Sequence, residues 1–224
     1  MGKFFFINFK SYPEATGKNA LSLAKKIESA AAAKKSPVQT VLVVSALDVL
    51  RVSSQVSLKV FGQHFDPNTA GAFTGSVGVE SLLSAGAKGS ILNHAEKKVS
   101  DEFIKKAVLR AKELGFPVML CAESVERGIF FAELKPDFIA FELPELIGGT
   151  VSVSTARPDL VKGFIEKVQE KNSSCKLIVG AGIKTPLDVK KSIEFGADGV
   201  FVSSGVVKSP GPKKAVKELL SGFE

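Results

Sequence analysis

The sequence predicts an α/β fold in the form of a single (β/α)8 barrel, and three observations support this. Short segments rich in Val, Ile, Leu and Phe alternate with segments whose apolar residues recur at helical spacing. The strand-like segments number eight, and their nearly continuous apolar character is typical of parallel strands covered by helices. In 224 residues, each strand and helix pair has about 28 residues, near the minimum for such a unit. A closed barrel explains this better than an open doubly wound sheet, the alternative fold.

The predicted strands are each about five residues long. In chain order they cover Phe4 to Phe9, Thr40 to Val44, Leu58 to Gly62, Gly89 to Asn93, Val118 to Cys121, Phe138 to Phe141, Lys176 to Val179 and Gly199 to Val202. No linker or low-complexity stretch interrupts the pattern, so we expect residues 1–224 to form one barrel domain.

Helices are predicted in the segments that separate the strands. Three of them are marked by Asn19 to Ala33, by the apolar stripe Phe103, Ile104, Ala107, Val108, Ala111 and Leu114, and by the stripe Leu160, Val161, Phe164, Ile165 and Val168. The second stripe ends at Gly115, a residue typical of helix C-termini. Thr185 before Pro186, and Arg157 before Pro158, are typical of helix starts.

Composition indicates an ordinary folded protein, with 45% apolar and 24% charged residues. The apolar start, Phe4 to Ile7, is far shorter than a signal-peptide core, and no apolar run approaches the length of a membrane span. We therefore expect a cytoplasmic protein with no membrane partner.

The net charge of +7 fits attraction of an anion, either a nucleic acid or a phosphorylated metabolite. The lysines are scattered, and one Tyr with no Trp gives little surface for base stacking, which argues against nucleic acid. Cys121 and Cys175 fall in apolar strand-like runs without metal or redox spacing, so we predict neither a disulfide nor a metal site.

Function in such barrels gathers at the carboxyl ends of the strands. The two-residue period of the first strand puts Asn8 and Lys10 on the same side. The fourth strand ends at His94 and the sixth at Glu142. A cation, an imidazole and a carboxylate are therefore expected on one rim.

Phosphate sites in these barrels favour the loops after the seventh and eighth strands. Those loops contain Gly180-Ala181-Gly182 and Ser203-Ser204-Gly205, each short and followed by a helical stretch. Their backbone N–H groups are suited to hold a phosphate, although ordinary tight turns also use such residues.

The order of these motifs resembles that of the triosephosphate isomerase family over the entire chain. The matching runs are Asn8-Phe9-Lys10, Gln63-His64, Gly71-Ala72-Phe73-Thr74-Gly75, Asn93-His94-Ala95-Glu96, Glu142-Leu143-Pro144-Glu145-Leu146-Ile147-Gly148, Gly180-Ala181-Gly182-Ile183 and Ser203-Ser204-Gly205. The compact length, His64 and the Gly-Ala-Gly-Ile loop resemble the archaeal branch. The resemblance implies a TIM barrel that interconverts dihydroxyacetone phosphate and D-glyceraldehyde 3-phosphate without a cofactor or metal.

The resemblance also implies roles for individual residues. Glu142 is the base that moves the carbon-bound proton, His94 is a neutral imidazole that stabilises the enediolate, and Lys10 adds positive charge. Glu96 is implied to hold Lys10 in place. The implied substrate-binding residues are Asn8, Phe9, Lys10, Ile147, Gly182, Ser203 and Ser204, and the implied lid is Pro144, Glu145, Leu146, Ile147, Gly148, Gly149 and Thr150.

Several residues depart from the family pattern without removing a catalytic group. Ala95 replaces a Ser after the histidine, Leu143 replaces a Pro at the first lid hinge, Gly149-Thr150 inverts the usual order, and Ser152 stands where Pro is common. We expect an active enzyme whose lid closes with altered kinetics.

Thr74 resembles the family residue that reaches the Asn8 and Lys10 region of a neighbouring subunit. The resemblance therefore implies a homodimer or a homotetramer, and the sequence does not choose between them.

Two other functions fit parts of the pattern. Another phosphosugar barrel enzyme, such as an epimerase or an indole-pathway isomerase, has similar phosphate loops, but Lys10, His94 and Glu142 without metal ligands favour the triose isomerase. The second alternative is a non-catalytic barrel that serves as a binding module, and the changed lid residues are compatible with it.

Overall fold

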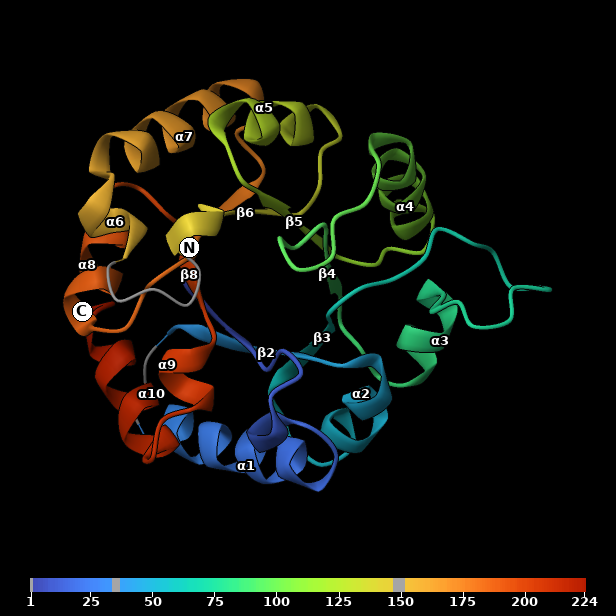
Figure 1. Ribbon diagram of the computed structural model, residues 1–224, viewed down its shortest axis with the longest axis horizontal. Coiled ribbons are helices and arrows are strands. Elements are labelled where there is room, and N and C mark those ends of the chain that lie inside the picture. Colours follow the sequence, from blue (N-terminus) through green and yellow to red (C-terminus); the bar gives the residue numbers. More distant parts are fainter. Residues whose placement is uncertain (1, 34–36, 147–151) are drawn as a thin grey trace.

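The computed structural model describes residues 2–33, 37–146 and 152–224. Its centre is a closed barrel of eight parallel strands in sequence order, in which the last strand pairs with the first (Figure 1). The strands are β1 (Phe4–Asn8), β2 (Gln39–Val44), β3 (Lys59–Gly62), β4 (Ser90–Leu92), β5 (Val118–Ala122), β6 (Phe138–Phe141), β7 (Lys176–Val179) and β8 (Gly199–Val202). The predicted barrel is therefore confirmed, and the open sheet is wrong.

Helices surround the barrel on its outside (Figure 1). They are α1 (Lys18–Ala32), α2 (Ala46–Ser53), α3 (Val79–Ser84), α4 (Asp101–Glu113), α5 (Val125–Glu133), α6 (Val153–Ala156), α7 (Pro158–Lys171), α8 (Pro186–Glu194), α9 (Ser204–Val207) and α10 (Pro212–Ser221), with short 3-10 turns η1 (Pro13–Ala15) and η2 (Pro144–Leu146). Among the described residues, no helix has the length and apolar content needed to cross a membrane.

The predicted helix ends follow the expected backbone chemistry. Gly115, just after α4, has a φ of +60°, a conformation that glycine adopts without strain. At the start of α8, the Thr185 hydroxyl accepts from the backbone N–H of Asp188, and the Asp188 carboxylate accepts from the N–H of Thr185. This reciprocal capping box satisfies two N–H groups that the helix itself leaves unpaired.

The barrel has an apolar core inside the strands and a second one between strands and helices, as the alternation of strand side chains requires. Phenylalanine rings dominate the inner core. The Phe6 ring lies 5.6 Å from Phe61, 5.3 Å from Phe138 and 6.4 Å from Phe201, each in an edge-to-face arrangement. Such ring pairs favour a fixed geometry. The inner core is therefore expected to hold the carboxyl ends of the strands rigidly in place.

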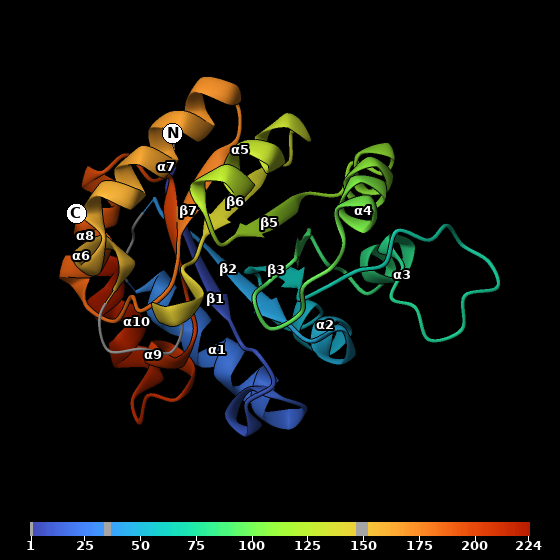
Figure 2. The ribbon, with the colours of Figure 1, turned by 45° about the horizontal axis from the view of Figure 1, so that its top comes forward.

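One segment between β3 and α3 leaves the outline of the barrel. It projects well beyond the ring of helices in two views (Figures 1 and 2). Within this segment Phe73 is 47% exposed, and Thr74 is exposed next to it. The Asp66 carboxylate fixes the base of the segment by accepting from the backbone N–H of Val77 at 2.7 Å.

Candidate active site

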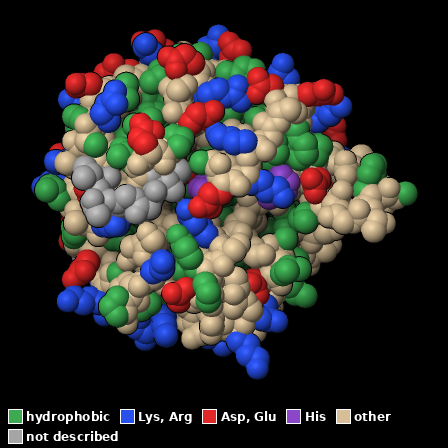
Figure 3. All heavy atoms as spheres, in the orientation of Figure 1, with side chains coloured by type: hydrophobic (Ala, Val, Ile, Leu, Met, Phe, Trp, Pro, Cys, Tyr) green, Lys and Arg blue, Asp and Glu red, His purple; other side chains and the backbone are tan. Residues whose placement is uncertain are grey.

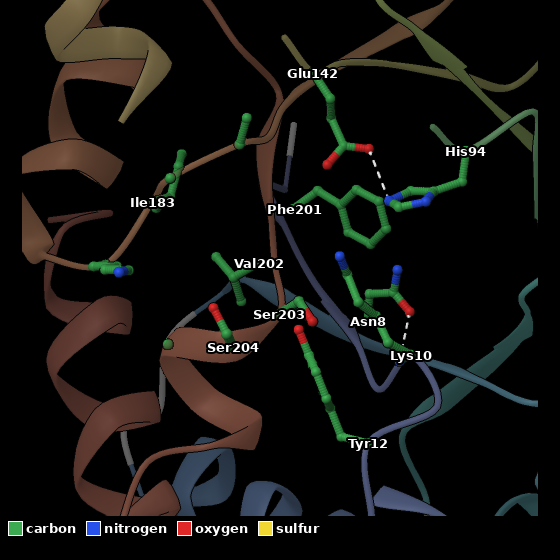
Figure 4. A pocket seen from close by; sticks show the side chains of 14 residues that line it. Asn8, Lys10, Tyr12, His94, Glu142, Ile183, Phe201, Val202, Ser203 and Ser204 are labelled. Atoms are coloured by element: carbon green, nitrogen blue, oxygen red, sulfur yellow. Dashed lines mark hydrogen bonds and ion pairs between the residues drawn. The ribbon is translucent and has the colours of Figure 1, made fainter. Parts of the chain in front are cut away.

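A pocket opens at the carboxyl end of the barrel, where sequence analysis placed the site. Its walls come from β1, β4, β6, β7 and β8 and the loops that follow them (Figure 4). It is lined by Asn8, Lys10, Tyr12, His94, Glu142, Ala181, Gly182, Ile183, Lys184, Phe201, Val202, Ser203, Ser204 and Gly205. The free volume is about 40 Å³, and a second hollow of about 560 Å³ shares Asn8, Lys10, Tyr12 and His94 with it.

Glu142 directly follows β6 and points across the barrel end towards His94 (Figure 4). Its Oε2 lies 3.5 Å from His94 Nε2, is buried, and has no hydrogen-bond partner among the described residues. Burial raises the pKa of Glu142, while His94, Lys10 and the Cys121 thiol act in the opposite direction. A buried carboxylate with a raised pKa and an unpartnered oxygen facing a pocket is suited to accept a proton.

His94 is presented by an unusual turn at the end of β4. Asn93 has a φ of +61°, a left-handed conformation that asparagine tolerates better than most residues. Its side chain holds the turn from both sides, since Nδ2 donates to the Cys121 carbonyl at 3.1 Å and Oδ1 accepts from Val99 N–H at 3.2 Å. The next residue, His94, therefore points into the barrel end.

The tautomer of His94 follows from its backbone contact. The N–H of Glu96 donates to His94 Nδ1 at 3.2 Å, so Nδ1 is an acceptor and carries no proton. The Glu96 carboxylate is 3.6 Å from the same nitrogen, but the backbone donor favours the neutral ring. The proton is therefore on Nε2, the nitrogen that faces Glu142 and the pocket.

Lys10 sits on a tight turn after β1, with a φ of +48°. The Asn8 Oδ1 atom accepts from Lys10 N–H at 2.9 Å and from Gln63 Nε2 at 3.2 Å, and Gln63 also donates to the Lys10 carbonyl at 3.0 Å. The Lys10 ammonium contacts Glu96 Oε1 at 2.6 Å. These contacts fix Lys10 over the pocket and leave the amide nitrogen of Asn8 to donate into it (Figure 4).

The other wall of the pocket is suited to an anion. Ser203 Oγ is buried and has no hydrogen-bond partner among the described residues, and Ser204 opens α9 beside it (Figure 4). Across from them, Ala181 and Gly182 have φ values of +67° and +72°. Lys184, which lines the pocket beside this turn, adds positive charge.

One predicted binding residue does not line this pocket. The Phe9 side chain is fully buried in the core between barrel and helices, because the alternation that turns Asn8 and Lys10 inward turns Phe9 outward. The Phe9 side chain therefore does not face the pocket, and a role for Phe9 in substrate binding stays a prediction. Glu96 lines the second hollow rather than the pocket, which fits its implied contact with Lys10.

The predicted lid lies only partly within the described residues. Pro144, Glu145 and Leu146 form η2 at its start, next to Glu142. Ile147, Gly148, Gly149 and Thr150 lie outside the described residues. Thr74 lies on the projecting segment and does not line the pocket of its own chain.

Sequence reasoning missed several lining residues. These are Tyr12, Lys184, Phe201 and Val202, which lie at or after the carboxyl ends of β1, β7 and β8. Tyr12 lies beyond the turn at Lys10, where β1 has ended, so strand alternation gives no signal for it. Charged side chains of both signs are spread over this face of the molecule (Figure 3).

Comparisons with known proteins agree with the geometry of this site. The family model for triosephosphate isomerase matches residues 3–218. The triosephosphate isomerase of Methanothermus fervidus is 41% identical over 215 residues, which is 96% of each chain. That of Thermoplasma volcanium is 39% identical over 96% of this chain and 97% of its own. That of Methanosarcina acetivorans is 36% identical over 97% of both. The chain therefore belongs to the triosephosphate isomerase family.

Proposed function

We propose that this protein interconverts dihydroxyacetone phosphate and D-glyceraldehyde 3-phosphate by proton transfer through an enediolate. The observation that carries this is the meeting of Glu142, His94 and Lys10 from three separate stretches of the chain around one pocket. The buried and unpartnered Ser203 hydroxyl at the other wall supplies a donor for the phosphate. Family membership supports the same reaction.

The reaction begins with the Glu142 carboxylate as base. It removes a proton from the carbon that bears the hydroxyl group, the electron pair forms the carbon–carbon double bond, and the carbonyl oxygen gains negative charge. The protonated Glu142 then returns the proton to the neighbouring carbon. Its raised pKa makes the carboxylate a stronger base than an exposed one, although the substrate proton remains only weakly acidic.

His94 and Lys10 stabilise the oxygen on which charge develops. The Nε2–H of a neutral imidazole donates to the enediolate oxygens and moves a proton from one to the other, which completes the exchange of carbonyl and hydroxyl. The Lys10 ammonium lowers the energy of the same charge. The removal of one such donor typically lowers kcat by about 10²–10³-fold.

Neither alternative function is favoured by the comparisons. All the relatives described above carry the name triosephosphate isomerase, and their similarity extends over nearly the whole chain. In the part of the chain that the structure describes, no three His, Cys, Asp or Glu side chains are placed to share a metal ion. The changed residues Ala95, Leu143 and Ser152 leave Lys10, His94 and Glu142 in place.

The test is conversion of glyceraldehyde 3-phosphate in D2O with a chelator present, followed by NMR. The proposal expects dihydroxyacetone phosphate with deuterium on the carbon that received the proton, at a rate independent of the chelator. A strict metal requirement would favour an epimerase. No conversion by a folded protein would favour the binding module.

We further propose that the protein assembles at least into a dimer in the cytoplasm. The hollow beside Lys10 has a volume of about 560 Å³ and is lined in part by Gln63, His64 and Glu96, and we propose that the Thr74 segment of a second copy enters it. Light scattering measures the mass of the assembly. If it finds only monomer at micromolar concentration, the dimer is contradicted, and if it finds the mass of four chains, the protein is a tetramer. The similarity to the Methanothermus fervidus enzyme supports an archaeal type.

A further inference from the structure

A second cavity lies at the opposite end of the barrel, where the strands begin. Its volume is about 270 Å³, and we call it the amino-end cup. It is lined by Phe4, Val41, Lys59, Phe61, Lys88, Pro117 and Phe138, which lie among the first three residues of strands or in the turns just before them. The cup shares no lining residue with the catalytic pocket or with the hollow beside Lys10. The proposed isomerase reaction makes no use of it.

The walls of the cup are aromatic and already fixed in place. The rings of Phe4 and Phe138 meet edge to face at 5.0 Å, and those of Phe61 and Phe138 at 6.2 Å. The Phe61 ring lies directly on Gly89, since a Cβ at that glycine would come within 2.4 Å of it. Rigid rings offer a planar ligand apolar contact without first having to be ordered.

The charged side chains that line the cup are all positive. Lys59 and Lys88 are its charged lining residues, and both are exposed. The Lys59 ammonium donates to the Gln39 side chain at 3.0 Å, while the Lys88 side chain has no hydrogen-bond or ion-pair partner among the described residues. Two cations at the edge of an aromatic cavity complement a molecule that has an apolar ring and a negative group.

Two aspartates near this end of the barrel make their hydrogen bonds and ion pairs outside the cup. The Asp137 carboxylate accepts from Val118 N–H at 2.9 Å. The Asp198 carboxylate pairs with Lys176 at 3.3 Å and accepts from Leu177 N–H at 3.0 Å. Neither aspartate lines the cup, so the attraction of Lys59 and Lys88 for an anion is not cancelled inside it.

We propose that the amino-end cup binds a small aromatic carboxylate. The ring lies against Phe4, Phe61 and Phe138, and the carboxylate meets Lys59 and Lys88 at the edge. The cavity is slightly smaller than the roughly 300–1,000 Å³ of pockets for drug-sized ligands, which limits the occupant to one or two rings. A triose phosphate has no apolar face to fill the cup, so the ligand differs in class from the proposed substrate.

Naphthoate is a suitable probe because it has two rings, one carboxylate and its own fluorescence. The first experiment records methyl NMR spectra of the whole protein as naphthoate is added in the presence of excess inorganic phosphate. Val41 lines the cup and Val202 lines the catalytic pocket, so their methyl groups report on the two sites separately. The proposal expects saturable shifts at Val41 and none at Val202. Shifts at Val202 alone, or no saturable shift at Val41, would overturn it.

The second experiment tests the role of the lysines by fluorescence titration. The variant Lys59→Gln/Lys88→Gln is expected to weaken naphthoate binding about three- to tenfold, as the loss of two partly exposed ion pairs implies. The control Lys213→Gln/Lys217→Gln removes the same charge on α10 and is expected to change binding less than twofold. All four lysines are exposed, so folding is expected to persist and circular dichroism checks it.

A neutral probe separates charge recognition from simple apolar binding. Naphthamide has the same rings without the negative charge. We expect it to bind the parent more weakly than naphthoate, and equally well to the parent and to Lys59→Gln/Lys88→Gln. Equal naphthoate affinity in the cup variant and the control variant, or equal binding of both probes to the parent, contradicts the proposal. Because these readouts do not involve isomerase activity, their failure is distinguishable from failure of the proposed function.

Discussion

Gly180 lies directly against the side chain of Glu142. A Cβ at Gly180 would come within 2.6 Å of Glu142 Cγ and 2.9 Å of Oε1. The Gly180 backbone is itself held by a hydrogen bond from its N–H to the Phe141 carbonyl at 2.9 Å, so it has little freedom to move away. The absence of a side chain at this position therefore permits the carboxylate to face His94.

The substitution Gly180→Ala tests this contact. The added methyl is expected to displace the Glu142 carboxylate, and a displacement of about 1 Å can lower a rate about 10²-fold. We expect kcat to fall by about one to two orders of magnitude, with a smaller change in KM. Gly163→Ala on α7 is the matched control, because nothing lies within 4 Å of its added Cβ. Steady-state kinetics that find parent activity in Gly180→Ala would show that the contact does not orient Glu142.

The dependence of activity on pH reports on the Cys121 thiol beside Glu142. Burial raises the pKa of Glu142, and the hydrogen bond from Cys121 lowers it in part. Since the base must be ionised, kcat/KM is lost as pH falls through the pKa of Glu142 in the free enzyme. Removing the donor in Cys121→Ala is therefore expected to move this acid limb to higher pH. Cys121→Ser keeps a donor and is expected to stay closer to the parent, and superimposable profiles of all three proteins contradict the effect.

The Ser203 hydroxyl is expected to bind the phosphate of the substrate. It is buried without a partner, and a hydrogen bond to a charged group contributes about 1.5–3 kcal/mol. Ser203→Ala should therefore lower kcat/KM about ten- to hundredfold and weaken competitive inhibition by inorganic phosphate. Ser29→Ala, on the exposed face of α1, should leave both unchanged. Undiminished phosphate inhibition in Ser203→Ala would exclude this role.

Asp188 stabilises the fold through a set of hydrogen bonds at the start of α8. Its carboxylate accepts from Ser152 Oγ at 2.5 Å, from Thr185 Oγ1 at 2.8 Å and from Lys184 N–H at 3.1 Å. Burial alone would raise the pKa of Asp188, but these hydrogen bonds outweigh it and the pKa is lowered. Because the pKa of Asp188 is lower in the folded than in the unfolded protein, its ionised carboxylate stabilises the fold. This stabilisation is complete at pH values above the pKa of Asp188 in the unfolded protein, and it is lost as the pH falls through the pKa in the folded protein.

We expect Asp188→Asn to lower the free energy of unfolding by about 1–3 kcal/mol near pH 7. The difference from the parent should shrink at acid pH, as both proteins then carry a neutral side chain. Urea unfolding at a series of pH values measures it. The exposed Asp159→Asn on α7 serves as control and should show little change. A difference for Asp188→Asn that does not vary with pH would argue against the ionised carboxylate as its source.

The sequence predicted the barrel well because its signals are local. Segments such as Phe138–Phe141 and Lys176–Val179 have the same bounds in the structure. Other strands differ by one residue at one end, except β4, which is one residue shorter than predicted at each end. Strand alternation also placed Asn8 and Lys10 together. The same rule turns the Phe9 side chain away from the pocket and into the core between barrel and helices.

Contacts between residues that are distant in the chain could not be predicted from the sequence. Three contacts join residues that are far apart in the chain. They are the contact of Gly180 with Glu142, the hydrogen bond of the Cys121 thiol to the same carboxylate, and the hydrogen bond from Gln63 to Asn8. Their geometry depends on the tilt and register of the closed sheet rather than on local preference. The amino-end cup could not be predicted for a different reason, because its lining residues are ordinary apolar and lysine residues of strand starts and carry no motif.

The most direct test of the account compares the parent protein with Glu142→Gln in the conversion of glyceraldehyde 3-phosphate. The amide keeps the shape of the side chain but cannot accept the proton. We expect kcat to fall about 10²–10⁴-fold with an intact fold and a KM within several-fold of the parent. Equal rates in the two proteins would contradict the assignment of Glu142 as the base, and with it the proposed mechanism.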